Sequence, residues 1–111
     1  ICFLINFNEM KEVTILHHNN GDGAGSAKMY MDSANKIMLS RIPAGASIGM
    51  HEHKTSAEIN YVLSGEGKAI CDGAEEELKP GRVHYCPKGS AHSIVNTGDG
   101  ELALFTVVPE Q

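Results

Sequence analysis

The apolar residues of this chain occur in short runs that end at glycine, proline or asparagine, and no stretch keeps a 3.6-residue apolar period long enough for a helix. Short runs bounded by such turn residues are typical of β-strands. The runs that we interpret as strands are Ile1–Ile5, Val13–Leu16, Met29–Met31, Lys36–Ile42, Lys68–Cys71, Glu75–Leu78 and Leu102–Val108. The pattern therefore predicts a single all-β domain over residues 1–111, built as an antiparallel barrel or sandwich.

Two connecting segments carry local information. Asp72-Gly73 lies between two predicted strands and is a strong signal for a two-residue β-hairpin, because both residues accept a positive φ. Residues 17–26 contain glycines at positions 21, 23 and 25, which is not the G-x-G-x-x-G spacing of a dinucleotide-binding loop. We expect these residues to form a mobile surface loop that exposes His17 and His18 to solvent.

The composition excludes several classes of partner. The chain carries a formal net charge of −5, whereas proteins that bind nucleic acid through its phosphates present a basic surface. No apolar run reaches the ~18 residues that a membrane-spanning helix needs. The cysteines at positions 2, 71 and 86 are odd in number and widely spaced, which favours a reducing compartment, so we expect a cytoplasmic protein.

Residues 45–65 contain the strongest chemical signal of the chain. His51 and His53 are two residues apart, so on a β-strand both imidazoles leave from the same face. Glu58 follows His53 at an odd spacing, and an unbroken strand would send it to the opposite face. We expect residues 54–56 to form a turn or bulge that brings Glu58 back on the next strand.

A second segment, residues 81–96, provides a further candidate. Here a Pro-x-Gly turn leads into a strand that carries His92. Imidazole and carboxylate groups together are a ligand set for first-row transition metals. The candidate metal ligands are therefore His51, His53, Glu58 and His92.

The two segments read G-x5-H-x-H-x4-E-x6-G and G-x5-P-x-G-x2-H-x3-N. They resemble the two sequence motifs of the cupin superfamily, with motif 1 at residues 45–65 and motif 2 at residues 81–96. The matching positions are Gly45, His51, His53, Glu58, Gly65, Gly81, Pro87, Gly89, His92 and Asn96. Because one position matches by chance only about one time in fifteen, this agreement is not a coincidence. The resemblance implies a small single-domain cupin of the RmlC-like type, folded as an antiparallel double-stranded β-helix, or jelly roll.

The resemblance also implies that His51, His53, Glu58 and His92 hold a divalent transition metal. Fe, Mn, Ni, Co and Zn all accept this ligand set, and the sequence does not choose among them. Four protein ligands around an octahedral ion leave two positions for water, for a chelating substrate, or for substrate and dioxygen. The alternative is a hydrogen-bonded polar pocket without metal, as in relatives that bind sugar nucleotides.

Other residues near the motifs have structural or pocket roles. The motif glycines and Pro87 are expected to serve tight turns, and Asn96 to bond backbone at the end of its strand. Asn60 lies two residues after Glu58 and should face the same interior, either as a hydrogen-bonding group of the pocket or as a polar residue bonded to a neighbour. His84 and Cys86 share one strand face, and either can line the pocket. For Cys86 the alternative is a buried, inert thiol.

Three classes of function remain open. The first, which we favour, is a metal-dependent dioxygenase or related oxidoreductase that acts on a small chelating substrate. The second is a non-catalytic module that senses or stores a small ligand through the metal. The third is an isomerase or lyase in which a pocket base transfers a proton. No second titratable pair stands out at motif spacing, which counts against the third class.

We also expect a homodimer. A barrel of 111 residues leaves strand edges and an apolar outer face that a second copy can cover. The predicted N-terminal strand at Ile1–Ile5 could pair with its equivalent across a two-fold axis.

Overall fold

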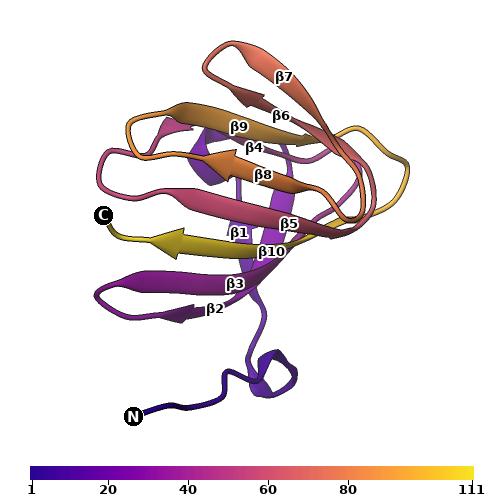
Figure 1. The fold of residues 1–111 in the computed structure, drawn as a ribbon. Coiled ribbons are helices and arrows are strands. Elements are labelled where there is room, and N and C mark those ends of the chain that lie inside the picture. The colour runs from indigo at the N-terminus through magenta and orange to yellow at the C-terminus, as the bar shows by residue number, and fades with distance from the viewer.

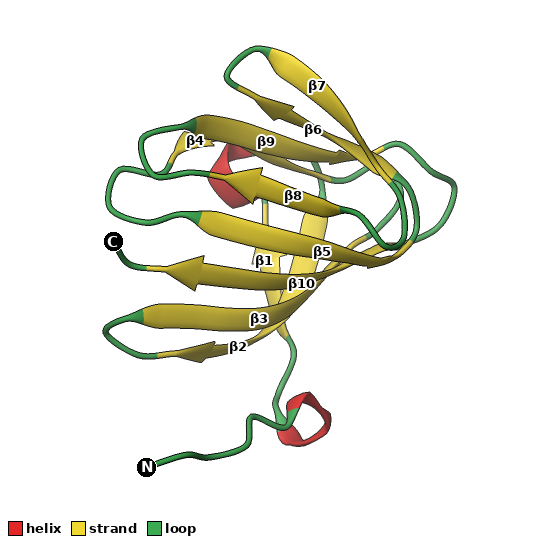
Figure 2. Ribbon diagram, in the orientation of Figure 1, coloured by secondary structure: helices red, strands yellow, loops and turns green.

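The computed structural model describes all residues 1–111 and consists of β-strands with two single turns of 3₁₀ helix (Figures 1 and 2). The strands are β1 (Val13–Leu16), β2 (Ala24–Met31), β3 (Asn35–Ile42), β4 (Ser47–Glu52), β5 (Glu58–Ser64), β6 (Gly67–Cys71), β7 (Ala74–Leu78), β8 (Val83–Cys86), β9 (Ala91–Asn96) and β10 (Leu102–Pro109). The 3₁₀ turns are η1 (Phe7–Glu9) and η2 (His18–Asn20). No helix is long and apolar enough to cross a membrane.

The strands form two antiparallel sheets that face each other. The six-stranded sheet has the order β1-β2-β3-β10-β5-β8, and the four-stranded sheet has the order β4-β9-β6-β7. The chain crosses from one sheet to the other before β4, β5, β6, β8, β9 and β10, and only β1-β2-β3 and β6-β7 are local hairpins. The predicted all-β jelly-roll class is confirmed. The two sheets remain separate layers instead of closing into one continuous barrel.

Six of the seven predicted strands are confirmed, since each lies within or coincides with an observed strand. The exception is Ile1–Ile5, for which the prediction of a strand is wrong. Only the Phe3 ring of this segment is seen against the sheet, 5.5 Å from the ring of Tyr30, whereas Ile1 and Leu4 are exposed. The ring of Phe7 then packs edge-on against Phe105 at 6.3 Å. The segment is therefore attached to the sheet face through a ring contact, and its backbone does not pair with a strand edge.

The predicted turns are confirmed by the backbone. Asp72 and Gly73 have φ values of 50° and 84°, the left-handed conformations that a two-residue hairpin between β6 and β7 requires. The four motif glycines also have positive φ, at 80° for Gly45, 88° for Gly65, 90° for Gly81 and 91° for Gly89. Glycine adopts this conformation without the steric cost that other residues incur.

The segment at residues 17–26 only partly matches the surface loop that we expected. His17 and His18 are exposed as predicted, but Gly21 is buried and residues from 24 onward already belong to β2. A Cβ at Gly21 would lie 2.1 Å from the carbonyl oxygen of Ser47. The backbone of η2 therefore lies directly on β4, and the small size of glycine permits this contact.

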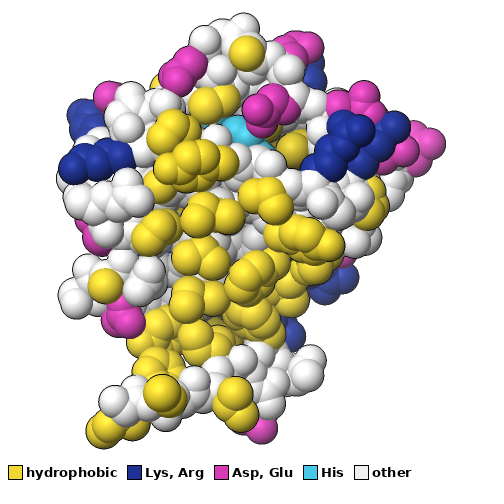
Figure 3. All heavy atoms as spheres, viewed as in Figure 1, with side chains coloured by type: hydrophobic (Ala, Val, Ile, Leu, Met, Phe, Trp, Pro, Cys, Tyr) yellow, Lys and Arg dark blue, Asp and Glu magenta, His cyan; other side chains and the backbone are white.

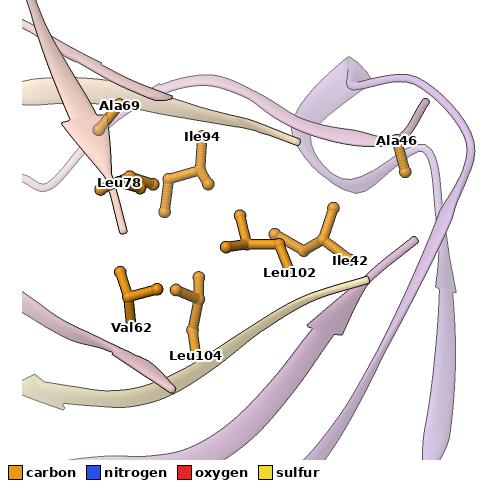
Figure 4. Packing of buried hydrophobic residues seen from close by; sticks show 8 residues of the cluster. All are labelled: Ile42, Ala46, Val62, Ala69, Leu78, Ile94, Leu102 and Leu104. Atoms are coloured by element: carbon orange, nitrogen blue, oxygen red, sulfur yellow. The ribbon is translucent and has the colours of Figure 1, made fainter. Parts of the chain in front are cut away.

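The interior between the sheets is apolar at one end and polar at the other. The apolar end is a cluster of buried side chains from both sheets, namely Ile42, Ala46, Val62, Ala69, Leu78, Ile94, Leu102 and Leu104 (Figure 4). Along β5 the inward positions change from Val62 in this cluster to Asn60 and Glu58. Along β9 they change from Ile94 to His92. Each of these strands thus contributes to the core and to the polar end.

We predict that Gly49→Ala destabilises the protein more than Gly100→Ala. A Cβ at Gly49 would lie 1.9 Å from the carbonyl oxygen of Asn19, so η2 must move away from β4, whereas nothing lies within 4 Å of a Cβ at Gly100. Forced overpacking of this kind costs about 1–3 kcal/mol of unfolding free energy. Urea denaturation of the two variants and the wild type measures the difference, and equal stabilities would contradict the backbone contact.

Candidate metal centre

The four candidate ligands come from both sheets. His51 of β4 and His92 of β9 are directly paired in the four-stranded sheet, and a β-bulge between Ile48 and His51 sets this register. His53 follows the end of β4. Glu58 is the first residue of β5 in the facing sheet, so the predicted turn does return it toward the histidines.

The donor atoms of these side chains converge on one point. The Nε2 atoms of His51, His53 and His92 are 3.1 Å apart in all three pairs. The carboxylate oxygens of Glu58 lie 3.4 Å from Nε2 of His53 and 3.3 Å from Nε2 of His92. The four ligand atoms all lie within 4.8 Å of one another. The structure therefore brings together all four residues that the sequence predicted.

The hydrogen bond of His51 fixes which nitrogen faces this point. Its Nδ1 lies 2.8 Å from the carbonyl oxygen of Gly49, and a carbonyl oxygen only accepts, so Nδ1 carries the hydrogen. Nε2 of His51 then presents a lone pair. The Nδ1 of His53 lies 3.2 Å from the hydroxyl oxygen of Ser56, which is able to accept a hydrogen bond from the same tautomer. These outer contacts orient the rings in the form that a metal requires.

Two consecutive hydrogen bonds support the carboxylate of Glu58. The Nδ2 amide of Asn60 donates to it at 2.8 Å, and the hydroxyl of Thr106 donates to the side-chain oxygen of Asn60 at 2.6 Å. Burial raises the pKa of Glu58, but hydrogen bonding and charge from His53 and His92, together with Asn60, outweigh burial and lower this pKa to about 2. The carboxylate is thus held as an anion at neutral pH.

His92 is completely buried and neutral. Burial lowers its pKa to about 4, with Glu58 opposing this shift and the neighbouring imidazoles adding to it. Its Nδ1 lies 2.8 Å from Nε2 of His84, and Nδ1 of His84 lies 2.6 Å from a carboxylate oxygen of Glu76. Sequence reasoning named His84 only as a possible pocket residue and missed Glu76.

Of the two predicted pocket residues, one lines the cavity and the other does not. Asn60 lines the cavity beside the cluster, as described above. Cys86 is fully buried and is not among the residues that line this cavity. Burial, and after it the neighbouring Cys71, raises the pKa of Cys86 to about 12, so the thiol stays protonated. This environment matches the alternative of a buried, inert thiol.

A cavity of about 510 Å³ opens from the cluster toward the inner face of β1, β2 and β3. Its lining includes the ligands His51, His53 and Glu58, apolar side chains such as Met38 and Val108, and the ammonium-bearing Lys36. His18, for which the sequence predicts only exposure to solvent, also borders it with its ring 6.4 Å from the ring of His51. Partial burial, and then the proximity of His51, lower the pKa of His18.

The donor set fits a single cation. Three lone pairs and a carboxylate that point at one position repel one another, and a positive ion between them removes this cost. For metal–nitrogen bonds of about 2.1 Å, adjacent positions of an octahedron are about 3.0 Å apart. The 3.1 Å spacing of the imidazole nitrogens agrees with this value. The cluster can therefore hold a metal ion.

Comparison with known proteins identifies similar chains. A family model described as the cupin domain matches residues 38–108. An oxalate-binding protein of Thermotoga maritima is 38% identical over 83 residues, which are 75% of this chain and 69% of that protein. The crystal structure of a predicted oxalate decarboxylase from Thermotoga maritima aligns with a TM-score of 0.91 and 27% identity, over 98% of this chain and 100% of that chain. The cupin domain of Schizosaccharomyces pombe Cnp3 aligns with a TM-score of 0.75 at 18% identity, over 78% of this chain and 61% of that chain, which shows a shared fold alone.

Proposed function

The chain belongs to the cupin family, and on that premise we propose that it binds a divalent transition metal and uses this metal to bind a small chelating carboxylate. The ligands are His51, His53, Glu58 and His92. The observation that carries the proposal is the convergence of three Nε2 atoms and one carboxylate on a single point. When bound, the metal supplies a Lewis acid and, if it is Fe, Mn, Ni or Co, the redox chemistry of an oxidoreductase.

Two observations support a small anionic ligand. One is the relative named as an oxalate-binding protein, with 38% identity over most of both chains. The other is Lys36, which lines the cavity on the inner face of β3. Lys36 pairs with Val108 of β10, one residue beyond the Val107–Ile59 pair that joins β10 to β5. Its backbone is therefore two strands, about 10 Å, from that of Glu58, within reach of a long lysine side chain.

The residues around the cluster have distinct roles in this function. Asn60 holds the Glu58 carboxylate in place and leaves both carboxylate oxygens directed at the imidazoles. Lys36 attracts the negative charge of the ligand, and the apolar wall that includes Met38 and Val108 limits the access of water. We propose oxidoreductase chemistry of the dioxygenase type as the reaction class. An isomerase or lyase is not favoured, because Glu58 is fully engaged and is not free to act as a base.

We predict that the purified protein carries about one equivalent of a divalent transition metal and that His92→Ala loses it. Removing a ligand should weaken metal binding by more than about 100-fold, because even outer hydrogen-bonding partners contribute 10–100-fold. Elemental analysis and competition with a chelator measure both effects, and His17→Ala is the control because this ring does not line the cavity.

The identity of the metal decides between the reaction classes. Fe, Mn, Ni or Co supports the oxidoreductase, whereas Zn favours a binding, isomerase or lyase role. Absence of metal from both the wild type and the variant after reconstitution with each ion would refute the proposed function.

We predict that Lys36→Met weakens the binding of oxalate to the metal-loaded protein about fivefold, which corresponds to about 1 kcal/mol for an exposed ion pair. Isothermal titration calorimetry with oxalate as the probe measures this change. Lys28→Met is the matched control, because it removes the same charge from β2 at a position that does not line the cavity. Equal oxalate affinities in the two variants would show that Lys36 does not contact the ligand.

We further propose that the protein is a homodimer whose copies meet through the outer face of the six-stranded sheet. Figure 3 shows hydrophobic side chains gathered over this face. The outward residues of β5 and β8 are large, apolar and exposed, namely Ile59, Tyr61, Leu63, Val83 and Tyr85. The apolar face that these side chains form continues onto β10, where Phe105 pairs with Tyr61 of β5. A wide apolar face fits an identical face of a second copy, as in an isologous dimer.

Light scattering at micromolar concentration is expected to give the mass of a dimer for the wild type and of a monomer for Tyr61→Lys. The lysine would place a charge in the centre of the apolar contact, where it has no partner. Met50→Lys is the control, because Met50 is an exposed apolar residue on β4 of the other sheet. A monomeric wild type would rule out the dimer, and dissociation by both variants would rule out this face.

A further inference from the structure

We propose that Glu76 acts through His84 as a positioning pair for the metal ligand His92, and this inference rests on the proposed metal site. The Glu76 carboxylate holds the ring of His84, and His84 in turn holds the ring of His92. In this arrangement Nε2 of His92 faces the metal with its lone pair. Neither Glu76 nor His84 would touch the metal or the carboxylate that the metal binds.

The three side chains form a continuous chain from the surface to the cluster. The carboxylate of Glu76 on β7 lies 2.6 Å from Nδ1 of His84 on β8, and its side chain is 53% exposed. His84 is buried and its Nε2 lies 2.8 Å from Nδ1 of His92 on β9. The chain also links the sheets, because β8 belongs to the six-stranded sheet and β7 and β9 to the four-stranded sheet.

The chemistry of the groups gives this chain a direction. A metal bound to Nε2 of His92 requires a lone pair there, so the hydrogen of this imidazole lies on Nδ1. Nδ1–H of His92 then donates to Nε2 of His84, and the hydrogen of His84 lies on its own Nδ1. That Nδ1–H donates to Glu76, whose carboxylate only accepts. Every hydrogen bond is satisfied in one set of tautomers, and it is the set that a bound metal needs.

The neighbours of Glu76 on the same strand show that this contact is specific. Glu75 is paired with Lys68 at 3.3 Å, and Glu77 with Lys79 at 2.8 Å. Residues two apart on a strand point to the same face, so Glu76 shares the inner face with the buried Leu78. Glu75 and Glu77 point to the opposite face. Among three consecutive glutamates, one is directed at an imidazole and the other two at lysines.

The experiment compares metal affinity in Glu76→Ala, Glu76→Gln and Glu77→Ala, measured by competition of Zn(II) with a chelator. Loss of a partner that orients a metal-bound histidine is expected to weaken metal binding by about 10–100-fold in Glu76→Ala. Glu77→Ala removes the same charge from the adjacent position and should retain the wild-type affinity. Glu76→Gln keeps an acceptor oxygen for His84 and should recover part of the loss.

A second measurement reports on the hydrogen bond itself. In the Zn(II)-loaded wild type, long-range ¹H–¹⁵N NMR should show Nδ1–H tautomers for both His84 and His92. It should also show a strongly deshielded proton between His84 and Glu76, because hydrogen bonds to a carboxylate are short. This proton signal should disappear in Glu76→Ala and remain in Glu77→Ala. The Nδ1–H signal of His92 should also change in Glu76→Ala, and a merely structural role for Glu76 would leave this second signal unchanged.

The outcomes separate this inference from the proposed function. If Zn(II) binds to the wild type but Glu76→Ala and Glu77→Ala have equal affinity, the positioning pair is refuted and the metal site stands. An Nε2–H tautomer of His84 in the zinc-loaded protein would also refute it. If His92→Ala binds Zn(II) as tightly as the wild type, the metal site itself is wrong.

Discussion

The repulsion between four electron-rich groups is the constraint on which the polar half of this protein depends. Three imidazole lone pairs and a carboxylate share a space in which no arrangement of hydrogens satisfies every contact. Each group has a hydrogen-bond partner on the side away from the others. The Gly49 carbonyl holds His51, Ser56 holds His53, His84 holds His92, and the Asn60 amide holds the Glu58 carboxylate. These partners fix the orientation of the side chains, so a cation that bound here would require little reorganisation of the site.

The apolar half of the interior makes this costly arrangement possible. Polar groups without solvent destabilise a fold unless they are paired, and outside the cluster every buried side-chain nitrogen or oxygen has a hydrogen-bond partner. The same strands supply both halves, since His92 and Ile94 are two residues apart on the inner face of β9. The strands that are anchored in the core by Ile94 and Val62 therefore place the polar side chains at the other end of the interior. The core therefore sets the position of the cluster.

Most strands, the turns and all four cluster residues could be predicted from the sequence, because these features depend on local spacing and on motif glycines. The missed features depend on contacts across the sheets. Nothing in the sequence distinguishes Glu76 from the glutamates on either side, and only the placement of β7 beside His84 does so. The contact of η2 with β4 at Gly49 is also invisible to local patterns. The segment at Ile1–Ile5 has the composition of a strand, but its backbone pairs with no strand and the ring of Phe3 contacts Tyr30 instead.

The position of β10 sets the order in which this protein can be assembled during synthesis. β10 is the last strand in the chain, yet it lies in the middle of the six-stranded sheet, between β3 and β5. Until residues 102–109 leave the ribosome, β3 and β5 have no common partner, and the core lacks Leu102 and Leu104. The nascent chain therefore carries open strand edges until β10 has been made, and the sheet then forms by insertion of this strand.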